Sequence, residues 1–144
     1  MAEYALRSLL EKERPGQTKV MSAGISAADG YPATLYAIEA ARIWDLNLTP
    51  HRSQMLSEKL INNADLIFAM SGEHVAEITR LVPTAEDRTY LLKKFPEPGT
   101  DGESVDDPIG QSLDQYNQTF LEIGEYLGKH LPEILERIDK KEYA

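Results

Sequence analysis

Side chains that could catalyse a reaction or bind a ligand stand directly after short apolar segments of this chain. Ser22 follows residues 19–21, Ser71 follows residues 66–70, and Asp107 lies in a long loop that follows residues 89–92. A carboxylate can act as a general acid, and ligands of a parallel sheet bind beyond the carboxyl ends of its strands. The bare residue types equally fit an Asp-Pro turn and a helix cap, and taken alone they favour those structural interpretations.

The amino-acid composition limits the kinds of reaction and binding site that this chain can support. The 144 residues include no cysteine, which excludes disulfides, thiolate metal sites and cysteine nucleophiles from them. Fifteen Lys and Arg stand against 24 Asp and Glu, a net charge of −9, so we expect no nucleic-acid partner and no anionic membrane. Binding of an anion to so acidic a chain would require a local positive site such as a helix N-terminus. His74 and His130 lack the spacing of metal ligands, and we expect no metal and no cofactor.

The length and the first residues indicate an ordinary globular protein. A chain of 144 residues can bury one core, so we expect a single domain over residues 1–144. No apolar run approaches the roughly 18 residues of a membrane span, and the first residues do not form a secretory signal. We therefore expect a cytoplasmic location.

Hydrophobic spacing predicts the elements that position these side chains. Helices are expected over 1–12, from Pro32 to about 47, from Ser71 to Pro83 and from Ser112 onward, the last kinked or divided at Pro132. Strands are expected over 19–21, 66–70 and 89–92.

The alternation of strands and helices predicts an α/β fold with three layers, in which helices cover both faces of a parallel sheet. Ligands bind such sheets beyond the carboxyl ends of the strands. A sheet of this kind ordinarily begins with a strand, whereas this chain begins with a helix. We therefore expect that a leading strand is missing from it.

Several short motifs, taken in order, resemble one family. They are the opening MAEYALRSLL, Met21-Ser22-Ala23-Gly24-Ile25-Ser26, Gly30-Tyr31-Pro32-Ala33, His51-Arg52-Ser53-Gln54, the run 66–70 and Asp107-Pro108-Ile109-Gly110. Together they resemble the low-molecular-weight protein-tyrosine phosphatases from residue 1 to about 138. The resemblance implies that family's fold and the hydrolysis of phosphotyrosine, or of phosphoarginine, through a phosphocysteine intermediate.

The chain departs from the family pattern at one point. The family's first strand and its Cys-x5-Arg phosphate loop precede the residues that match Met1-Ala2-Glu3, and the chain contains neither. The resemblance therefore implies a complete enzyme that is a phosphatase, whereas the chain as written lacks the nucleophile and is expected to be inactive. The alternative is a non-catalytic relic, or a phosphate-binding or interaction module, of the same fold.

The resemblance also implies roles for individual residues. Asp107 matches the general acid, with Asp106 as a weaker candidate one residue away. Ser22 and His51 match positions that brace the phosphate loop through a polar network.

Two further residues are expected to contact the substrate. Ile109 matches a position at which many relatives have an aromatic residue that packs against the phosphotyrosine ring. Tyr31 is a candidate for lining the mouth of the site and could equally be a packing residue. An isoleucine after Asp-Pro, where many relatives have an aromatic residue, weakens a strict preference for phosphotyrosine. Ser71, where many relatives have aspartate, is at least as easily explained as a helix cap. Both features resemble the bacterial branch that includes protein-arginine phosphatases.

The expected partners follow from this interpretation. They are a phosphorylated protein or a small phosphomonoester as substrate, and a strand-completing partner or a second copy of the chain. The latter is expected because unpaired backbone groups beside a missing central strand would destabilise the sheet.

Overall fold

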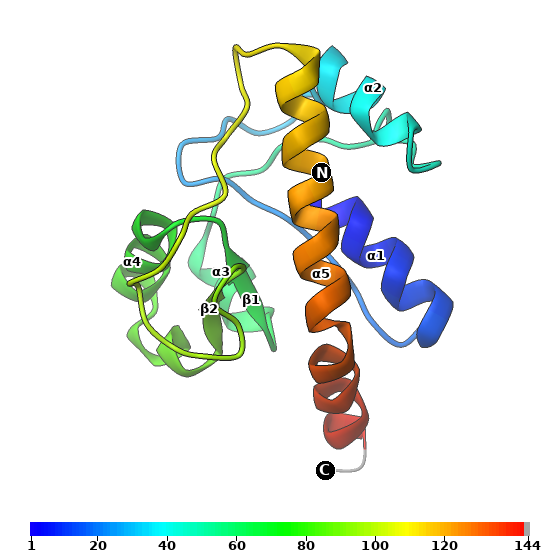
Figure 1. The fold of residues 1–144 in the computed structure, drawn as a ribbon. Helices are drawn as coiled ribbons and strands as arrows, with labels where there is room; N and C mark the ends of the chain where they lie inside the picture. Colours follow the sequence, from blue (N-terminus) through cyan, green and yellow to red (C-terminus); the bar gives the residue numbers. More distant parts are fainter. Residues whose placement is uncertain (143–144) are drawn as a thin grey trace. The chain divides into compact units, whose positions relative to one another are not determined.

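The computed structural model describes residues 1–142. Its elements in chain order are α1 (Ala2–Glu13), α2 (Leu35–Arg42), α3 (Glu58–Asn63), β1 (Ile67–Ala69), α4 (Gly72–Leu81), the 3-10 helix η1 (Pro83–Arg88), β2 (Thr89–Leu91) and α5 (Leu113–Glu142) (Figure 1). They belong to two compact units. Unit 1 comprises Met1–Ser22, Thr34–Thr49 and Pro108–Ala144, and unit 2 comprises Ala23–Ala33 and Pro50–Asp107.

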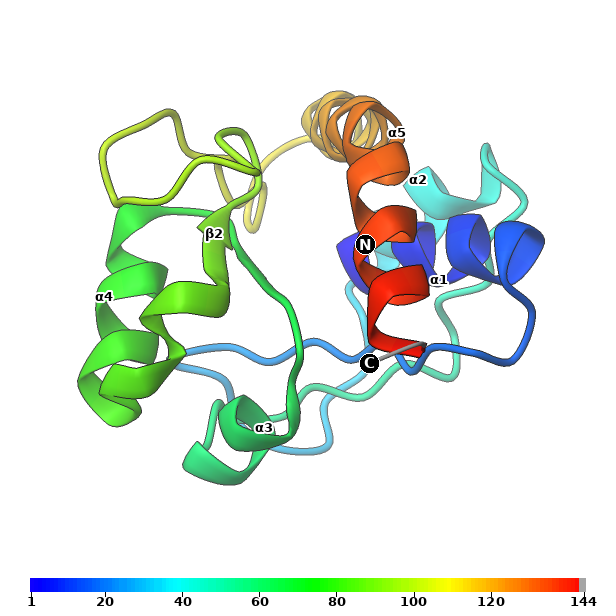
Figure 2. The same cartoon turned by 90° about the horizontal axis from the view of Figure 1, so that it is seen from below.

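Unit 1 is helical, and α5 is its main element. Helices α1 and α2 both pack against α5 (Figure 2). The buried stripe of α5 recurs at helical spacing and consists of Tyr116, Phe120, Ile123, Leu127 and Ile134. Small residues of α2, among them Ala40 and Ala41, are completely buried and allow this helix to lie close to α5. Trp44 stacks on Phe120 with a centroid distance of 6.2 Å.

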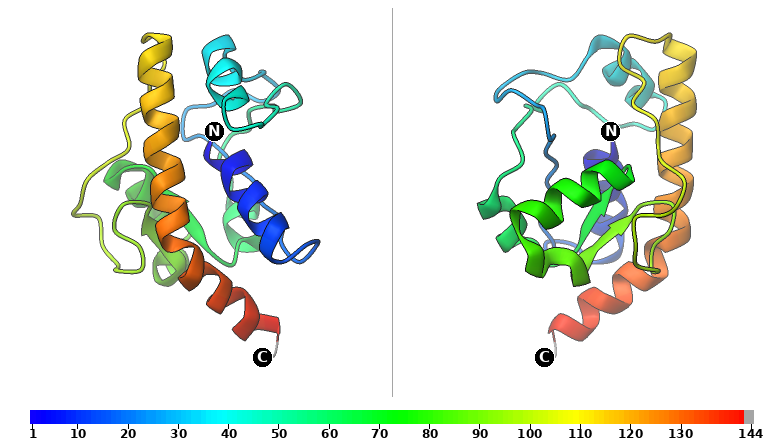
Figure 3. Two further views of the ribbon diagram at one scale, coloured as in Figure 1. Left: turned by 45° about the vertical axis from the view of Figure 1, so that its right-hand side comes forward. Right: turned by 90° about the vertical axis from the view of Figure 1, so that its left-hand side faces the viewer.

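Unit 2 contains a parallel sheet of two strands. Ile67, Phe68 and Ala69 pair in register with Thr89, Tyr90 and Leu91. One face of the sheet meets a core that includes Ala69, Leu91, Val75 and Ile78. Helix α4 packs beside the two strands (Figure 3) and contributes Val75 and Ile78 to this core. On the other face the Phe95 ring lies edge-on to Phe68 and to Tyr90, at 5.0 and 5.1 Å. Side chains therefore cover both faces of the sheet.

Local signals in the sequence place several helix starts correctly. The Ser71 hydroxyl accepts a hydrogen bond from the His74 N–H at 3.4 Å and caps α4. The Ser112 hydroxyl accepts one from the Gln115 N–H at 3.3 Å at the start of α5. α1 ends at Glu13, one residue beyond the predicted end at residue 12.

The predicted strand over residues 19–21 is wrong for the part of the chain that the structure describes. A strand needs hydrogen bonds to a neighbouring strand, and this segment forms none among residues 1–142. The Val20 carbonyl instead accepts a hydrogen bond from the Arg7 guanidinium. The nearest strand-like pairing is a single parallel bridge between Gly24 and Met55.

Other boundaries also differ. α2 ends at Arg42 rather than near residue 47, because the chain turns at Asp45, whose φ is +57°. The short helices α3 and η1 occupy stretches for which no helix was expected. α5 is not divided at Pro132, although its axis changes direction in its orange-to-red part (Figure 3).

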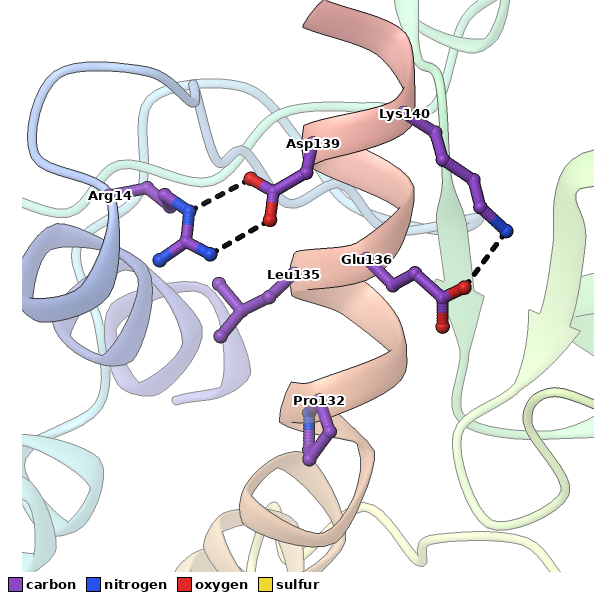
Figure 4. Close-up of a pocket in the computed structure, with 6 residues that line it drawn as sticks. All are labelled: Arg14, Pro132, Leu135, Glu136, Asp139 and Lys140. Carbon is purple, nitrogen blue, oxygen red and sulfur yellow. Dashed lines mark hydrogen bonds and ion pairs between the residues drawn. The ribbon is translucent and has the colours of Figure 1, made fainter.

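An ion pair ties the end of α1 to the end of α5 within unit 1. Arg14 Nε and Nη2 donate to the two carboxylate oxygens of Asp139 at 2.9 and 2.8 Å (Figure 4). These bonds lower the pKa of the Asp139 carboxyl below its ordinary value. The pair therefore stabilises the folded chain while Asp139 is ionised.

We expect Asp139→Asn to lower the Tm at pH 7 and to have a progressively smaller effect as the pH falls below about 4. The folded pKa lies below the unfolded one, so the stabilisation is complete above the unfolded value and is lost through the folded value. Thermal melts of both proteins between pH 2 and pH 7 measure this. Glu125→Gln, an exposed carboxylate on the same helix, is the control, and an Asp139→Asn deficit that persists at pH 2 would contradict the explanation.

Candidate functional site

A polar network at the start of α1 contains Ser22. The Ser22 hydroxyl donates to Glu3 Oε1 at 2.6 Å, and Arg7 Nη2 donates to Glu3 Oε2 at 2.5 Å. The same Arg7 nitrogen donates to the Val20 carbonyl at 2.7 Å. Glu3 and Arg7 are four residues apart on α1, so their side chains meet on one helix face.

This network lies in a shielded environment. The Glu3 side chain is only 11% exposed. Burial lowers the pKa of the Met1 α-ammonium, and the Glu3 carboxylate acts in the opposite direction. Met1, the N-cap residue of α1, forms no capping hydrogen bond with its side chain. Glu3 therefore fixes the direction of the Ser22 hydroxyl and balances the positive charge at this helix end.

In unit 2 the structure brings Tyr31 beside the segment that carries His51. The Ser53 N–H donates to the Tyr31 carbonyl at 2.7 Å, and the Tyr31 N–H donates to the Ser53 hydroxyl at 3.0 Å. The Tyr31 side chain is 64% exposed, whereas His51 is half-buried. Backbone pairing thus holds an accessible aromatic ring and an imidazole on adjoining segments.

Asp107 ends a loop that is tied to the carboxyl end of β1. The Val105 N–H donates to the Met70 carbonyl at 2.8 Å, and Val105 itself is buried. The loop also passes close to the first residue of α4: a Cβ on Gly72 would lie 2.8 Å from the Thr100 carbonyl oxygen. The Asp107 carboxylate is exposed beyond this anchor. An exposed carboxylate on an anchored loop is suited to proton transfer at a strand end.

The remaining predicted positions have simpler surroundings. Ile109 is 67% exposed and lies in a turn that the Gln111 N–H closes by donating to the Pro108 carbonyl at 2.9 Å. Ser22 and Ile109 belong to unit 1, whereas Tyr31, His51 and Asp107 belong to unit 2. Glu3 is the polar residue that the sequence analysis missed. Its spacing from Arg7 was the available signal, but that spacing is typical of any exposed helical ion pair.

Other features of the described residues carry less chemistry. A hollow on unit 1 is lined by Arg14, Pro132, Leu135, Glu136, Asp139 and Lys140, and its charges pair as Arg14–Asp139 and Lys140–Glu136 (Figure 4). Within residues 1–142, no three His, Asp or Glu side chains are grouped to hold a metal ion. No helix there combines the length and apolar composition needed to span a membrane.

Comparison with known proteins decides the family. The family model for low molecular weight phosphotyrosine protein phosphatase matches residues 1–143. This chain belongs to that family. Its membership confirms the expected α/β phosphatase fold and the expected resemblance. Members of the family act on phosphorylated proteins.

Individual relatives agree. The protein-arginine-phosphatase of Bacillus subtilis is 36% identical over 127 residues, which is 88% of this chain and 82% of the relative. The low molecular weight protein-tyrosine-phosphatase Etp of Escherichia coli K12 is 31% identical over 112 residues, 78% of this chain and 72% of the relative. The relatives thus include both the tyrosine and the arginine phosphatases that the sequence suggested.

A solved structure extends the comparison to the nucleophile. A YwlE arginine phosphatase superposes with a TM-score of 0.81 at 33% identity, over 95% of this chain and 89% of its own. That protein is a mutant with serine in place of cysteine at its seventh position, and its active-site serine is phosphorylated. This chain thus matches a phosphatase family but contains no cysteine.

We expect Glu3→Ala to lower the free energy of unfolding by about 1–2 kcal/mol, because the Ser22 hydroxyl and the Arg7 guanidinium lose their shared acceptor. Glu3→Gln keeps one acceptor oxygen and should lose less. Urea melts measure both. Glu13→Ala removes an exposed carboxylate at the other end of α1 and is the control. Equal stability of Glu3→Ala and Glu13→Ala would show that the network contributes nothing.

Proposed function

We propose that residues 1–144 supply the general acid and the substrate-contacting residues of a low-molecular-weight protein phosphatase, and that they are inactive without a Cys-x5-Arg loop. With such a loop the enzyme hydrolyses phosphotyrosine or phosphoarginine in proteins. The observation that carries this proposal is a family match over residues 1–143 in a chain with no cysteine. The two units are proposed to belong to one phosphatase domain.

The proposed reaction has two steps. In the first, the loop thiolate attacks phosphorus, the bond from phosphorus to the tyrosine oxygen or arginine nitrogen breaks, and Asp107 gives its proton to that leaving atom. In the second, Asp107 takes a proton from a water molecule that attacks the phosphocysteine. Inorganic phosphate leaves and the thiolate is restored. Neither step requires a metal or another cofactor.

Asp107 is proposed for this role because of its exposure and its anchor. The bond from the Val105 N–H to the Met70 carbonyl holds the loop at the carboxyl end of β1, where ligands of parallel sheets bind. Asp106 is also exposed but lies one residue nearer to the anchor. The Asp-Pro sequence restricts the backbone of Asp107, which helps to hold its carboxylate in one direction.

Ser22 and His51 are proposed to brace the phosphate loop. The hydrogen bond from Ser22 to the shielded Glu3 carboxylate gives its hydroxyl a fixed direction, as a bracing group needs. We add Glu3 to this group as a positioning residue. Tyr31 and Ile109 are proposed to contact the substrate, and both side chains are well exposed.

The rest of the proposal concerns partners and location. We propose a cytoplasmic enzyme that acts on phosphoproteins or small phosphomonoesters, with no nucleic-acid or membrane partner. A strand-completing partner or a second copy is a further proposed partner. The alternative function is that of a non-catalytic relic, or of a phosphate-binding or interaction module, of the same fold.

Adding an apolar strand and a Cys-x5-Arg loop in front of Met1 should create turnover of a phosphotyrosine peptide, whereas residues 1–144 alone should show none above background. In the extended protein, Asp107→Asn should reduce kcat by about 100-fold or more, because the tyrosine oxygen then leaves without a proton. Phosphate release measures all three proteins.

Asp106→Asn in the extended protein is the matched control and should retain most of the activity. Rapid turnover by residues 1–144 alone would refute the cysteine mechanism. An extended, folded protein that binds phosphate without turnover would favour the binding-module alternative.

Ile109→Tyr in the extended protein should raise the preference for a phosphotyrosine peptide over a phosphoarginine peptide. An aromatic pair contributes about 0.5–1.5 kcal/mol, so the ratio of the two kcat/KM values should rise by roughly 2–10-fold. Ile43→Tyr is the control because Ile43, at 69%, is as exposed as Ile109. An equal ratio in both variants would remove Ile109 from the substrate-contacting group.

A further inference from the structure

Two Asp-Gly sequences lie at exposed positions of unit 2, Asp29-Gly30 and Asp101-Gly102. In such a sequence the glycine amide nitrogen can attack the carboxyl group of the aspartate before it. Glycine favours this spontaneous reaction because it has no side chain to obstruct the attack. Since the two dipeptides are identical, a difference in their reactivity would come from their surroundings.

Hydrogen bonds occupy both reacting groups of Asp29-Gly30. The Asp29 Oδ1 atom accepts from the Met55 N–H at 2.8 Å, and the Gly30 N–H donates to the Ser53 carbonyl at 2.8 Å. The carboxyl group is thus held towards Met55, and the Gly30 nitrogen cannot turn towards it without losing a backbone hydrogen bond. The fold therefore protects this dipeptide although it is exposed to water.

The corresponding groups of Asp101-Gly102 are available. Among residues 1–142, neither the Asp101 carboxylate nor the Gly102 N–H has a hydrogen-bond partner. The Asp101 carbonyl accepts a hydrogen bond from Lys94 Nζ at 2.8 Å. This carbonyl belongs to the same peptide group as the Gly102 nitrogen, so the Lys94 ammonium withdraws electron density from that group and makes its N–H more acidic. The nitrogen attacks in its deprotonated form, and Lys94 therefore favours the reaction.

We propose that Asp101-Gly102 forms isoaspartate in the folded chain, whereas Asp29-Gly30 does not. The Gly102 nitrogen bonds to Cγ of Asp101, a carboxyl oxygen leaves as water, and a cyclic succinimide results. Water then opens the ring. Attack at Cγ restores aspartate, whereas attack at the other carbonyl breaks the original peptide bond, so that the main chain runs through Cβ and Cγ. The water lost in the first step is regained in the second, and no oxidant or cofactor is needed.

The added backbone carbon would fall in a segment that is held on both sides. Before it, the Thr100 carbonyl oxygen lies where a Cβ on Gly72 would be only 2.8 Å away. After it, the Val105 N–H donates to the Met70 carbonyl at 2.8 Å. The longer segment should release Val105 from Met70. The consequence for Asp107, two residues further on, rests on the proposed function, whereas the isomerisation itself does not.

The test incubates residues 1–144 at pH 7 for several weeks, folded or in urea. Trypsin releases the two dipeptides on separate peptides, 20–42 and 95–129, in which mass spectrometry measures isoaspartate from its fragment ions. In urea both should react at similar rates. In the folded chain Asp101 should react at least about fivefold faster than Asp29, the rate equivalent of one hydrogen bond. A folded ratio no higher than the ratio in urea overturns the proposal.

Two variants assign the signal and its structural effect. Asp101→Glu should abolish isoaspartate in peptide 95–129, because glutamate would have to close a larger ring, whereas Asp114→Glu, exposed and on the same peptide, should leave it unchanged. Hydrogen exchange at the Val105 N–H should be faster in the aged chain than in aged Asp101→Glu. Unchanged isoaspartate in Asp101→Glu overturns the site, and equal exchange at Val105 overturns the release of the loop.

The outcomes also separate this proposal from the proposed function. Ageing of the extended protein should lower its kcat, and Asp101→Glu should prevent that loss. An extended protein that forms isoaspartate but has no turnover when fresh removes the function and leaves the modification site standing. Turnover by an extended protein that forms no isoaspartate has the opposite meaning.

Discussion

The backbone pairing of β1 is the constraint on which the organisation of unit 2 depends. Three residues carry it, and the groups around their carboxyl end are placed by it. The Ala69 carbonyl accepts a hydrogen bond from the N–H of Leu92, just beyond β2. The next carbonyl, that of Met70, accepts one from the N–H of Val105 in the Asp107 loop. The following residue, Ser71, caps α4. One short strand thus fixes the direction of the second strand, the start of a helix and the end of the loop.

The side chains of this sheet explain why so short a strand is ordered. Ala69 and Leu91 lie in the core beneath α4, while Phe95 covers Phe68 and Tyr90 from the other face. Two strands alone are marginal in water, and apolar cover on both faces compensates. The same logic applies in unit 1, where α5 acquires its order from α1 and α2 and from the Arg14–Asp139 pair. In both units, long-range packing stabilises elements whose local sequence only permits them.

The chain contains some of the groups that the proposed reaction needs and lacks another. An exposed carboxylate and a directed hydroxyl can move a proton and position a loop. The proposed phosphocysteine intermediate needs a thiol, and no cysteine is present among the 144 residues. The arrangement of the other site residues can affect the rate of this reaction only when every reacting atom is present. For that reason the absence of cysteine limits the proposed activity of the chain more than the position of any residue in it.

Most helix starts and both strands were predictable, because caps and apolar runs act over a few residues. The prediction for residues 19–21 failed for the opposite reason: an apolar segment becomes a strand only beside a neighbour. α3 and η1 were missed because each is six residues long, too short for periodicity to reveal. Of the candidate site, the positions of Ser22 and Asp107 after apolar segments were visible in the sequence, but their partners were not.

The sequence by itself determined the family, the absence of cysteine and the capping of α4 and α5, since these depend on residue identity and on bonds across three residues. Only the tertiary structure decided that Glu3 directs Ser22, 19 residues away, and that the Asp107 loop is anchored to Met70. It also decided that the backbone N–H and carbonyl of Phe68 face away from β2. These features depend on which distant segments meet, and that is fixed by packing and by backbone pairing rather than by local spacing.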